Sequence, residues 1–234
     1  ENDRLTARVA TKGAELLSIY SKETEKEYIW QPGAEIWNAH SILLFPNPGR
    51  IAHDRTIIGG KVYPATMHGF AKDAEFAVAE YDRTHLVLEL AANEDTRFFF
   101  PYDKTMYFSL GAHPGFYCPI ELGESGEDYV LRFDRPQSID LLDAEEGTRL
   151  LTGKASKLPM DRNDIHVGEH FFDNGPMLYG NVHADTITLL SKKSGRFVEM
   201  GIRDFPFMCL WGVGAKMQIL CIEPWCGTSD PTDT

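Results

Sequence analysis

Short segments that alternate apolar and polar residues run through most of the chain. This period of two is typical of half-buried β-strands, because successive side chains point to opposite faces of a sheet. Clusters of Gly, Pro, Asn and Asp between the segments indicate turns. The pattern predicts strands over residues 4–10, 27–30, 76–82, 85–91, 106–110, 129–133, 185–191, 197–203, 207–213 and 217–223.

Helical periodicity is weak by comparison. No segment predicts an amphipathic helix of three turns, and the Phe-rich run 97–100 looks like the end of a strand. Residues 140–151 allow one short helix. Many strands with closely spaced turns favour an all-β fold, either a large antiparallel β-sandwich or a barrel-like sheet. Without repeats or linkers, residues 1–234 are predicted to form a single domain.

Composition and charge narrow the classes of partner. Of the 234 residues, 43% are hydrophobic and 25% are charged, which is an ordinary globular balance. The net charge of −12 disfavours binding to nucleic acid or to an anionic membrane surface, and it suits a neutral or cationic ligand. No apolar stretch approaches the roughly 18 residues of a membrane helix. The first residues lack signal-peptide character, so we expect a cytoplasmic protein.

The spacing of the cysteines gives little support for metal or disulfide chemistry. Cys118, Cys209, Cys221 and Cys226 show no paired spacing, so neither a zinc set nor a disulfide framework is predicted. The cytoplasm is therefore expected to keep them reduced.

The segment from His166 to His170 spells H-x-x-E-H, a zinc-protease pattern. That pattern needs a helix to align the two histidines, and Gly168 together with the flanking loops argues against one. We therefore expect no zinc here. Asp173, just beyond, is either a hydroxyl-binding loop carboxylate or part of a turn with the Asn and Gly that follow it.

His113 stands out after the predicted strand 106–110. Gly111 and Ala112 before it are small, and Pro114 after it favours an extended backbone at His113. A lone histidine in apolar surroundings is more often a core residue than a functional one, so its role depends on the rest of the chain.

Glu223 is the stronger local signal. It closes the apolar strand predicted at 217–223 and is followed by Pro224 and Trp225. A carboxylate at the end of a buried strand is costly unless it is paired or functional. An aromatic face beside a carboxylate is a common way to hold a sugar ring, and Trp225 is placed to supply one; Trp211 is expected to belong to the core.

Two further candidates lie in loops. Arg50 follows a Pro-Asn-Pro-Gly turn, where its guanidinium can hydrogen-bond a polyol or an anion, although a plain surface role fits equally well. His68 lies with Gly69 and Phe70 in a turn, where a purely structural role is the simpler reading.

Taken together and in order, these segments resemble the aldose 1-epimerase (galactose mutarotase) family, and its LacX-like bacterial branch most. The resemblance is carried by residues 11–19, 43–50, 68–76, 108–119, 210–213 and 221–230, with "GAHPGF" and "CIEPW" as the most specific motifs. It implies a β-sandwich of the galactose mutarotase type with a sugar cleft. It also implies residue roles: His113 as general acid, Glu223 as general base, and Arg50 and His68 as substrate-binding groups, with Asp173 a looser counterpart of the family's sugar-binding aspartate.

Two departures from the family accompany the resemblance. Relatives carry more sequence between the element at "FPYD" and the "GAHP" strand, so residues are expected to be missing after Asp103, either by deletion or through disorder. They also carry a further strand after "CIEPWCGTSD", so the C-terminus is expected to be either trimmed or disordered.

The implied reaction is the interconversion of the α and β anomers of a hexose. A base takes the proton of the anomeric hydroxyl while an acid protonates the ring oxygen, so no metal or organic cofactor is required. We expect His113 and Glu223 to face each other across a cleft, about a pyranose ring apart. The alternatives are a sugar-binding protein without turnover, a hexose-6-phosphate 1-epimerase using Arg50 and Arg55, and, less fittingly for this length, a polysaccharide lyase. The oligomeric state is not predicted.

Overall fold

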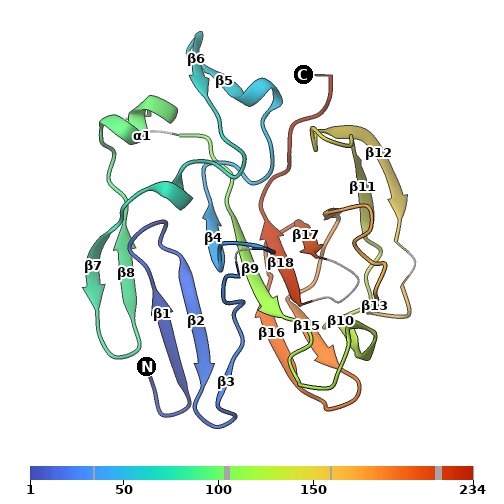
Figure 1. Ribbon diagram of the computed structural model, residues 1–234. Coiled ribbons are helices and arrows are strands. Elements are labelled where there is room, and N and C mark those ends of the chain that lie inside the picture. The colour runs from blue at the N-terminus through green and yellow to red at the C-terminus, as the bar shows by residue number, and fades with distance from the viewer. Residues whose placement is uncertain (34, 103–105, 159, 214–217, 234) are drawn as a thin grey trace.

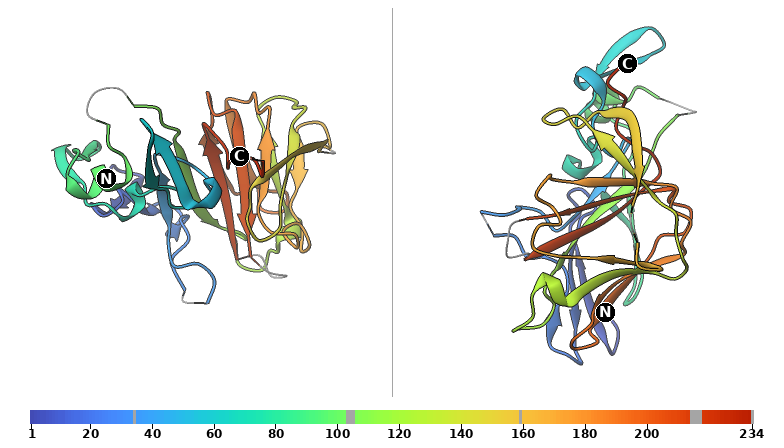
Figure 2. Two further views of the ribbon diagram at one scale, coloured as in Figure 1. Left: turned by 90° about the horizontal axis from the view of Figure 1, so that it is seen from above. Right: turned by 90° about the vertical axis from the view of Figure 1, so that its right-hand side faces the viewer.

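The computed structural model describes residues 1–33, 35–102, 106–158, 160–213 and 218–233. Antiparallel strands form nearly all of the regular structure in these ranges (Figure 1). The predicted all-β class is therefore confirmed. The N-terminal strands lie at one end of the molecule and the C-terminal strands at the other, in both Figure 1 and Figure 2.

Two large sheets contain most of the strands of the C-terminal part. The seven-stranded sheet has the order β12 (Leu151–Lys157), β11 (Asp140–Ala144), β14 (Met177–Gly180), β17 (Phe207–Gly212), β18 (Ile219–Trp225), β9 (Gly111–Tyr117) and β4 (Ser41–Leu44). The four-stranded sheet has the order β13 (Asp164–His166), β10 (Tyr129–Phe133), β15 (Thr186–Ser191) and β16 (Phe197–Gly201).

Smaller sheets and short helices complete the described fold. The N-terminal sheet comprises β1 (Leu5–Val9), β2 (Leu16–Ser21) and β3 (Lys26–Glu27), and two hairpins pair β5 (Arg55–Ile58) with β6 (Lys61–Pro64) and β7 (Ala77–Tyr81) with β8 (Leu86–Glu89). The helices are α1 (Glu94–Phe99) and the 3₁₀ turns η1 (Ala52–Asp54), η2 (Ala71–Asp73) and η3 (Gly126–Asp128). None of them is long and apolar enough to cross a lipid bilayer.

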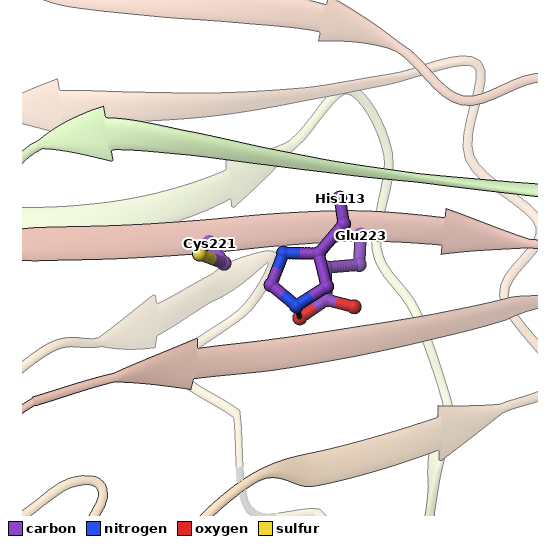
Figure 3. A group of neighbouring side chains, drawn as sticks. All are labelled: His113, Cys221 and Glu223. Atoms are coloured by element: carbon purple, nitrogen blue, oxygen red, sulfur yellow. Dashed lines mark ion pairs between the residues drawn. The ribbon is translucent and has the colours of Figure 1, made fainter. Parts of the chain in front are cut away.

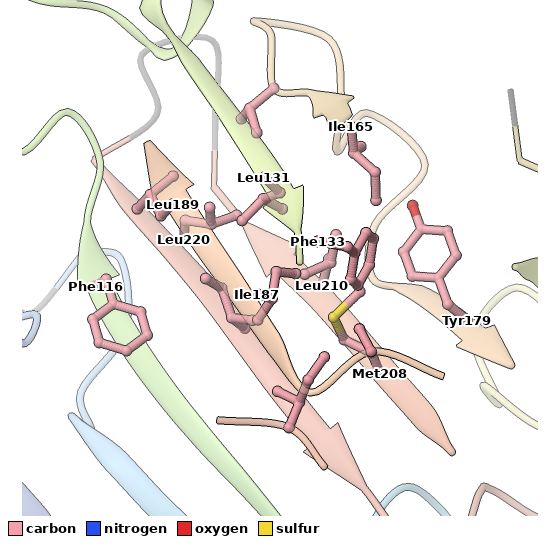
Figure 4. Close-up of a cluster of buried hydrophobic side chains, with 14 of the residues drawn as sticks. Phe116, Leu131, Phe133, Ile165, Tyr179, Ile187, Leu189, Met208, Leu210 and Leu220 are labelled. Carbon is pink, nitrogen blue, oxygen red and sulfur yellow. The ribbon is translucent and has the colours of Figure 1, made fainter. Parts of the chain in front are cut away.

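The main hydrophobic core lies between the two large sheets (Figure 4). Each strand contributes alternate residues, as the period of two predicts. The four-stranded sheet supplies Leu131, Phe133, Ile187 and Leu189, and the seven-stranded sheet supplies Met208, Leu210, Leu220 and Ile222. Because these residues are buried between the two sheets, only the opposite face of the seven-stranded sheet is available to form a cavity.

Strand β18 shows this division most clearly. Leu220 and Ile222 point into the main core, so Cys221 and Glu223 point to the opposite face of the sheet. The prediction that Glu223 ends its strand is wrong. The structure instead places it inside β18, because Pro224 and Trp225 continue the pairing with β17.

The strand predicted at 106–110 is wrong. Residues 106–110 have no strand structure, and β9 begins at Gly111, so His113 lies within the strand rather than at its end. The small residues that suggested a strand end are needed inside the sheet. A Cβ atom at Gly111 would lie 2.9 Å from Cδ1 of Trp225, and one at Gly115 would lie 2.8 Å from Cδ1 of Ile219.

Two other local predictions also differ from the structure. The Phe-rich run is the second half of α1, which begins because the Asn93 side chain accepts the Thr96 amide and the Thr96 hydroxyl accepts the Asn93 amide. Residues 140–151 form most of the β11–β12 hairpin rather than a helix. Its turn contains Gly147 and Arg149, both with positive φ angles, which a helix excludes.

A matched pair of leucine variants tests the position of the core. Leu131→Ala removes a fully buried side chain and is expected to lower the free energy of unfolding by about 2–5 kcal/mol. Leu122→Ala makes the same change at a fully exposed position and should alter it by about 0.5 kcal/mol or less. Urea unfolding of both variants measures the difference, and equal losses would contradict this core.

Candidate active site

A cavity of about 460 Å³ opens on the face of the seven-stranded sheet that points away from the main core. Five of the six site residues predicted from the sequence line it: Arg50, His68, His113, Glu223 and Trp225. They come from segments that are far apart in the chain, and strands β9 and β18 bring the central two together.

His113 and Glu223 lie side by side on adjacent strands (Figure 3). The antiparallel register pairs Cys221 with Gly115 and Trp225 with Gly111, which places residue 223 opposite residue 113. Nε2 of His113 is 3.3 Å from Oε1 of Glu223. The expected separation of a pyranose ring is therefore wrong. Both side chains occupy one wall of the cavity, because directly opposed residues of neighbouring strands are close together.

Burial dominates the electrostatics of this pair. Glu223 is 1% exposed, and removal from water raises the pKa of its carboxyl well above the usual range. Burial likewise lowers the pKa of His113 to about 3, with the neighbouring His68 adding to the effect. Both shifts favour the uncharged forms, so at neutral pH the pair holds one titratable proton and no net charge.

Several buried polar atoms around the cavity have no hydrogen-bond partner among the described residues. They are Nδ1 of His113, Oε2 of Glu223, Nε of Arg50 and Nε1 of Trp225. Leaving such groups unpaired costs about 1–3 kcal/mol each. Their concentration around one cavity favours a ligand with many hydroxyl groups, which can both donate and accept hydrogen bonds.

His68 is held by its backbone and ring together. Its amide donates to the carbonyl of Gly49 (2.9 Å), and its Nδ1 accepts from the amide of Gly49 (3.2 Å). Since Nδ1 accepts, the neutral ring carries its proton on Nε2. Burial first, and then the charges of Lys72 and Arg50, lower the pKa of His68 to about 4. His68 therefore acts as a neutral ring with one fixed donor.

The segment 229–232 ties two sides of the cavity together. The Arg50 amide donates to Oγ of Ser229 (3.0 Å), and the Asp230 amide donates to the Arg50 carbonyl (3.0 Å). On the other side, the Leu151 amide donates to the Asp230 carbonyl (2.9 Å), and the Thr232 amide donates to the Leu151 carbonyl (2.9 Å). This segment fixes the Arg50 loop relative to the β11–β12 hairpin.

Aromatic residues that the sequence analysis missed or misplaced also line the cavity. The Trp37 ring stacks on His113 with centroids 4.8 Å apart and an interplanar angle of 22°. Nothing in the sequence around Trp37 signalled this contact, which depends on how its loop folds over β9. Trp211 was expected to be core, but it is only half-buried and lines the cavity, with its edge toward Trp37 and His113.

Arg149 is a second cation at the cavity that the sequence did not reveal. Its backbone has a φ of 62°, an uncommon conformation for an arginine. Its guanidinium packs where Gly175 leaves room, since a Cβ at Gly175 would lie 2.6 Å from Nη2. Arg149 forms no ion pair with any residue that the structure describes.

The remaining sequence candidates lie outside the cavity. The Asp173 carboxylate contacts Nδ1 of His170 at 2.9 Å in an exposed turn. His166 is on β13 and His170 follows in that turn, so no helix aligns the two histidines as a zinc site requires. Arg55, at the start of β5, is exposed and does not line the cavity.

Comparison with solved structures places the fold. An X-ray structure of the galactose mutarotase related enzyme from Lactobacillus acidophilus has a TM-score of 0.90 and 28% identity, covering 100% of this chain and 86% of that chain. The crystal structure of a galactose mutarotase-like protein from Lactobacillus casei has a TM-score of 0.89 and 26% identity. The match covers 98% of this chain and 87% of that chain. The chain is thus a β-sandwich of the galactose mutarotase type, as the sequence motifs implied.

Sequence comparison agrees. The family model described as aldose 1-epimerase matches residues 1–103. The chromosomal LacX protein of Lactococcus lactis subsp. lactis is 28% identical, covering 98% of this chain and 87% of the relative. The resemblance to the aldose 1-epimerase family and to its LacX-like branch is therefore confirmed.

The comparison with LacX bears on the expected gap in the chain. Its alignment extends over 269 positions, more than the 234 residues of this chain, so the relative carries residues that are absent here. Such a gap is predicted after Asp103. Residues 103–105 lie outside the described part of the chain, so the position of the gap stays a prediction.

The buried histidines give a testable titration. Their pKa values of about 4 (His68) and about 3 (His113) lie below the ordinary 6.5, so both rings should stay neutral down to pH 5. Between pH 6.5 and 4, His68 is protonated in the unfolded chain but remains neutral in the folded protein. This residue therefore makes the free energy of unfolding decrease as the pH falls. Histidine NMR titrations, assigned with His68→Gln and His113→Asn, measure the pKa values.

Denaturation provides the matching control. Wild-type protein should lose more unfolding free energy than His68→Gln between pH 7 and pH 5. A ring that titrates near pH 6.5 in the folded protein, or equal losses in the two proteins, would contradict the buried neutral state.

Proposed function

We propose that this protein is an aldose 1-epimerase, an isomerase that interconverts the α and β anomers of a hexose. The observation that carries the proposal is the contact between His113 and Glu223 on the wall of a cavity surrounded by unpartnered polar atoms. The galactose mutarotase-type fold supports it.

Close contact between the two groups suits mutarotation. The anomeric hydroxyl oxygen and the ring oxygen are bonded to the same carbon, so the base and the acid that act on them must also be neighbours. A His–Glu contact of 3.3 Å allows both groups to reach the two oxygens of that carbon. In ring opening, one group takes the hydroxyl proton, the other protonates the ring oxygen, and the bond between C1 and that oxygen breaks.

One proton on the pair is sufficient for the cycle. In the roles implied by the family resemblance, Glu223 is the base and His113 the acid, which requires the proton to sit on His113 before ring opening. Burial favours the proton on Glu223 in the free site, so a single transfer along the 3.3 Å contact prepares the reactive form. Ring closure on the other face of the carbonyl reverses both transfers and regenerates the pair.

The other cavity residues provide binding groups. Arg50 and His68 offer donors to sugar hydroxyls, whereas Trp225 is only 4% exposed within a buried cluster and offers chiefly the N–H of its indole ring. Trp37 holds the His113 ring by stacking, which limits its rotation away from Glu223. Asp173 keeps only the weaker role that the resemblance gave it, because it lies away from the cavity. The cytoplasmic location, and the lack of nucleic-acid and membrane partners, stay predictions.

A sugar phosphate substrate is a second candidate, and Arg149 favours it. From the sequence, Arg50 and Arg55 are the cations that a hexose-6-phosphate 1-epimerase would use. Arg149 lines the cavity and Arg55 does not. The Arg149 guanidinium forms no ion pair with the described residues. An unpaired arginine is well suited to bind phosphate oxygens.

Glu223→Gln tests the proposed base. Gln keeps the shape of Glu but can neither accept nor release the proton, so mutarotation should fall by about 10²–10⁴-fold while sugar binding changes little. Polarimetry measures the rate, and calorimetry measures the affinity for the sugar. Arg50→Ala is the contrasting variant and should raise KM more than it lowers kcat. Near-normal turnover in Glu223→Gln would show that the base lies elsewhere.

Arg149→Gln tests the second candidate against a matched control. If the substrate carries a phosphate, this variant should lower kcat/KM for a hexose 6-phosphate about tenfold or more, because a charged hydrogen bond is lost. Its kcat/KM for the unphosphorylated hexose should change little. Arg55→Gln removes an arginine outside the cavity and should leave both values unchanged. Equal effects of Arg149→Gln on both sugars would argue for an unphosphorylated substrate.

A further inference from the structure

Cys221 joins His113 and Glu223 in a cluster of metal-ligating side chains (Figure 3). One ligand atom from each residue lies within 4.8 Å of the others, and all three residues are buried. Among the described residues, this is the group of three or more histidine, cysteine and acidic side chains close enough to hold one ion. The mutarotation scheme above uses the imidazole and the carboxyl and gives the thiol no part.

Sheet geometry builds this cluster. Cys221 and Glu223 are two residues apart on β18 and therefore point to the same face, while His113 reaches that face from β9. Cys221 pairs with Gly115, which has no side chain to cover it. Cys221 belongs to a buried cluster with Trp30 and Ile219, and Trp37 and Trp211 pack against that cluster. The backbone that carries the three side chains is held by the pairing of two central strands, and the side chains themselves can rotate.

The cluster also has unused coordination capacity. Nδ1 of His113 and Oε2 of Glu223 are buried without a hydrogen-bond partner in the described structure. Both side chains line the cavity, so an ion can approach them from there. Bonds from zinc to sulfur, nitrogen and oxygen are about 2.0–2.3 Å long, which places the ligand atoms of a tetrahedral site about 3.3–3.8 Å apart, so side-chain rotation must bring the most distant atoms about 1 Å closer.

We propose that His113, Cys221 and Glu223 form an inhibitory site for a soft divalent cation of the Zn²⁺ class. A thiolate, an imidazole and a carboxylate together suit Zn²⁺ or Cd²⁺ and not Mg²⁺ or Ca²⁺, which prefer oxygen ligands alone. On binding, the Cys221 thiol and the Glu223 carboxyl each release a proton to solvent as their bonds to the metal form. The ion then occupies both groups of the acid–base pair and blocks the site.

Cd²⁺ serves as the probe, because its bond to a thiolate gives an ultraviolet charge-transfer band. Titration of the full chain should show one tightly bound ion by calorimetry together with this band. Cys221→Ser should remove the band and weaken binding about tenfold or more. Cys226→Ser, which changes an exposed cysteine outside the cluster, should leave both readouts unchanged.

His113→Gln is the second variant, in case Cys221→Ser folds poorly, and it should also weaken Cd²⁺ binding about tenfold or more. Absence of the band in the wild-type protein, its loss in Cys226→Ser, or unchanged binding in either cluster variant would overturn the proposal. Metal binding is read directly in these experiments. They therefore decide whether the metal site exists even if the protein is not a mutarotase, whereas the inhibitory effect of the ion rests on the proposed function.

Discussion

The contact between a buried carboxyl and a buried imidazole is the constraint on which the proposed chemistry depends. A buried carboxyl group without a partner would destabilise the fold. Glu223 has His113 as its neighbour, and together the two groups hold one proton. The pair stays neutral overall while the proton can change sides. The pair therefore supplies an acid and a base together, although it carries no net charge in the resting protein. Both groups lie beside a cavity of sugar size.

Because successive side chains of the central strands point to opposite faces, one sheet contributes both to the hydrophobic core and to the cavity. Leu220 and Ile222 pack into the main core, while Cys221 and Glu223 reach the cavity side from the same strand. Stability and chemistry thus occupy opposite faces of β18, and the core holds the strand in the register that pairs it with β9. The loops that supply Arg50 and Arg149 are then fixed by one segment of backbone hydrogen bonds, at residues 229–232.

The sequence predicted what depends on local pattern and on specific motifs. Period-two alternation located β10, β15, β16, β17 and β18 but not β9, and the "GAHPGF" and "CIEPW" motifs pointed to His113 and Glu223, which lie side by side in the structure. Trp37 and Arg149 were missed because their place at the cavity results from loop packing and a left-handed turn. The separation of the pair was misjudged for a related reason: strand register is a long-range property that neither motif contains.

The central claim is that the neutral His113–Glu223 pair catalyses mutarotation rather than merely lining a sugar-binding cavity. The most direct measurement follows the optical rotation of freshly dissolved α-D-glucose and α-D-galactose with the wild-type protein at neutral pH, with the sugar affinity measured in parallel by calorimetry. The account predicts that the rotation approaches equilibrium faster than without protein, in proportion to protein concentration, for a sugar that binds. A sugar that binds while its rotation changes only at the spontaneous rate would contradict it and identify a sugar-binding protein without turnover.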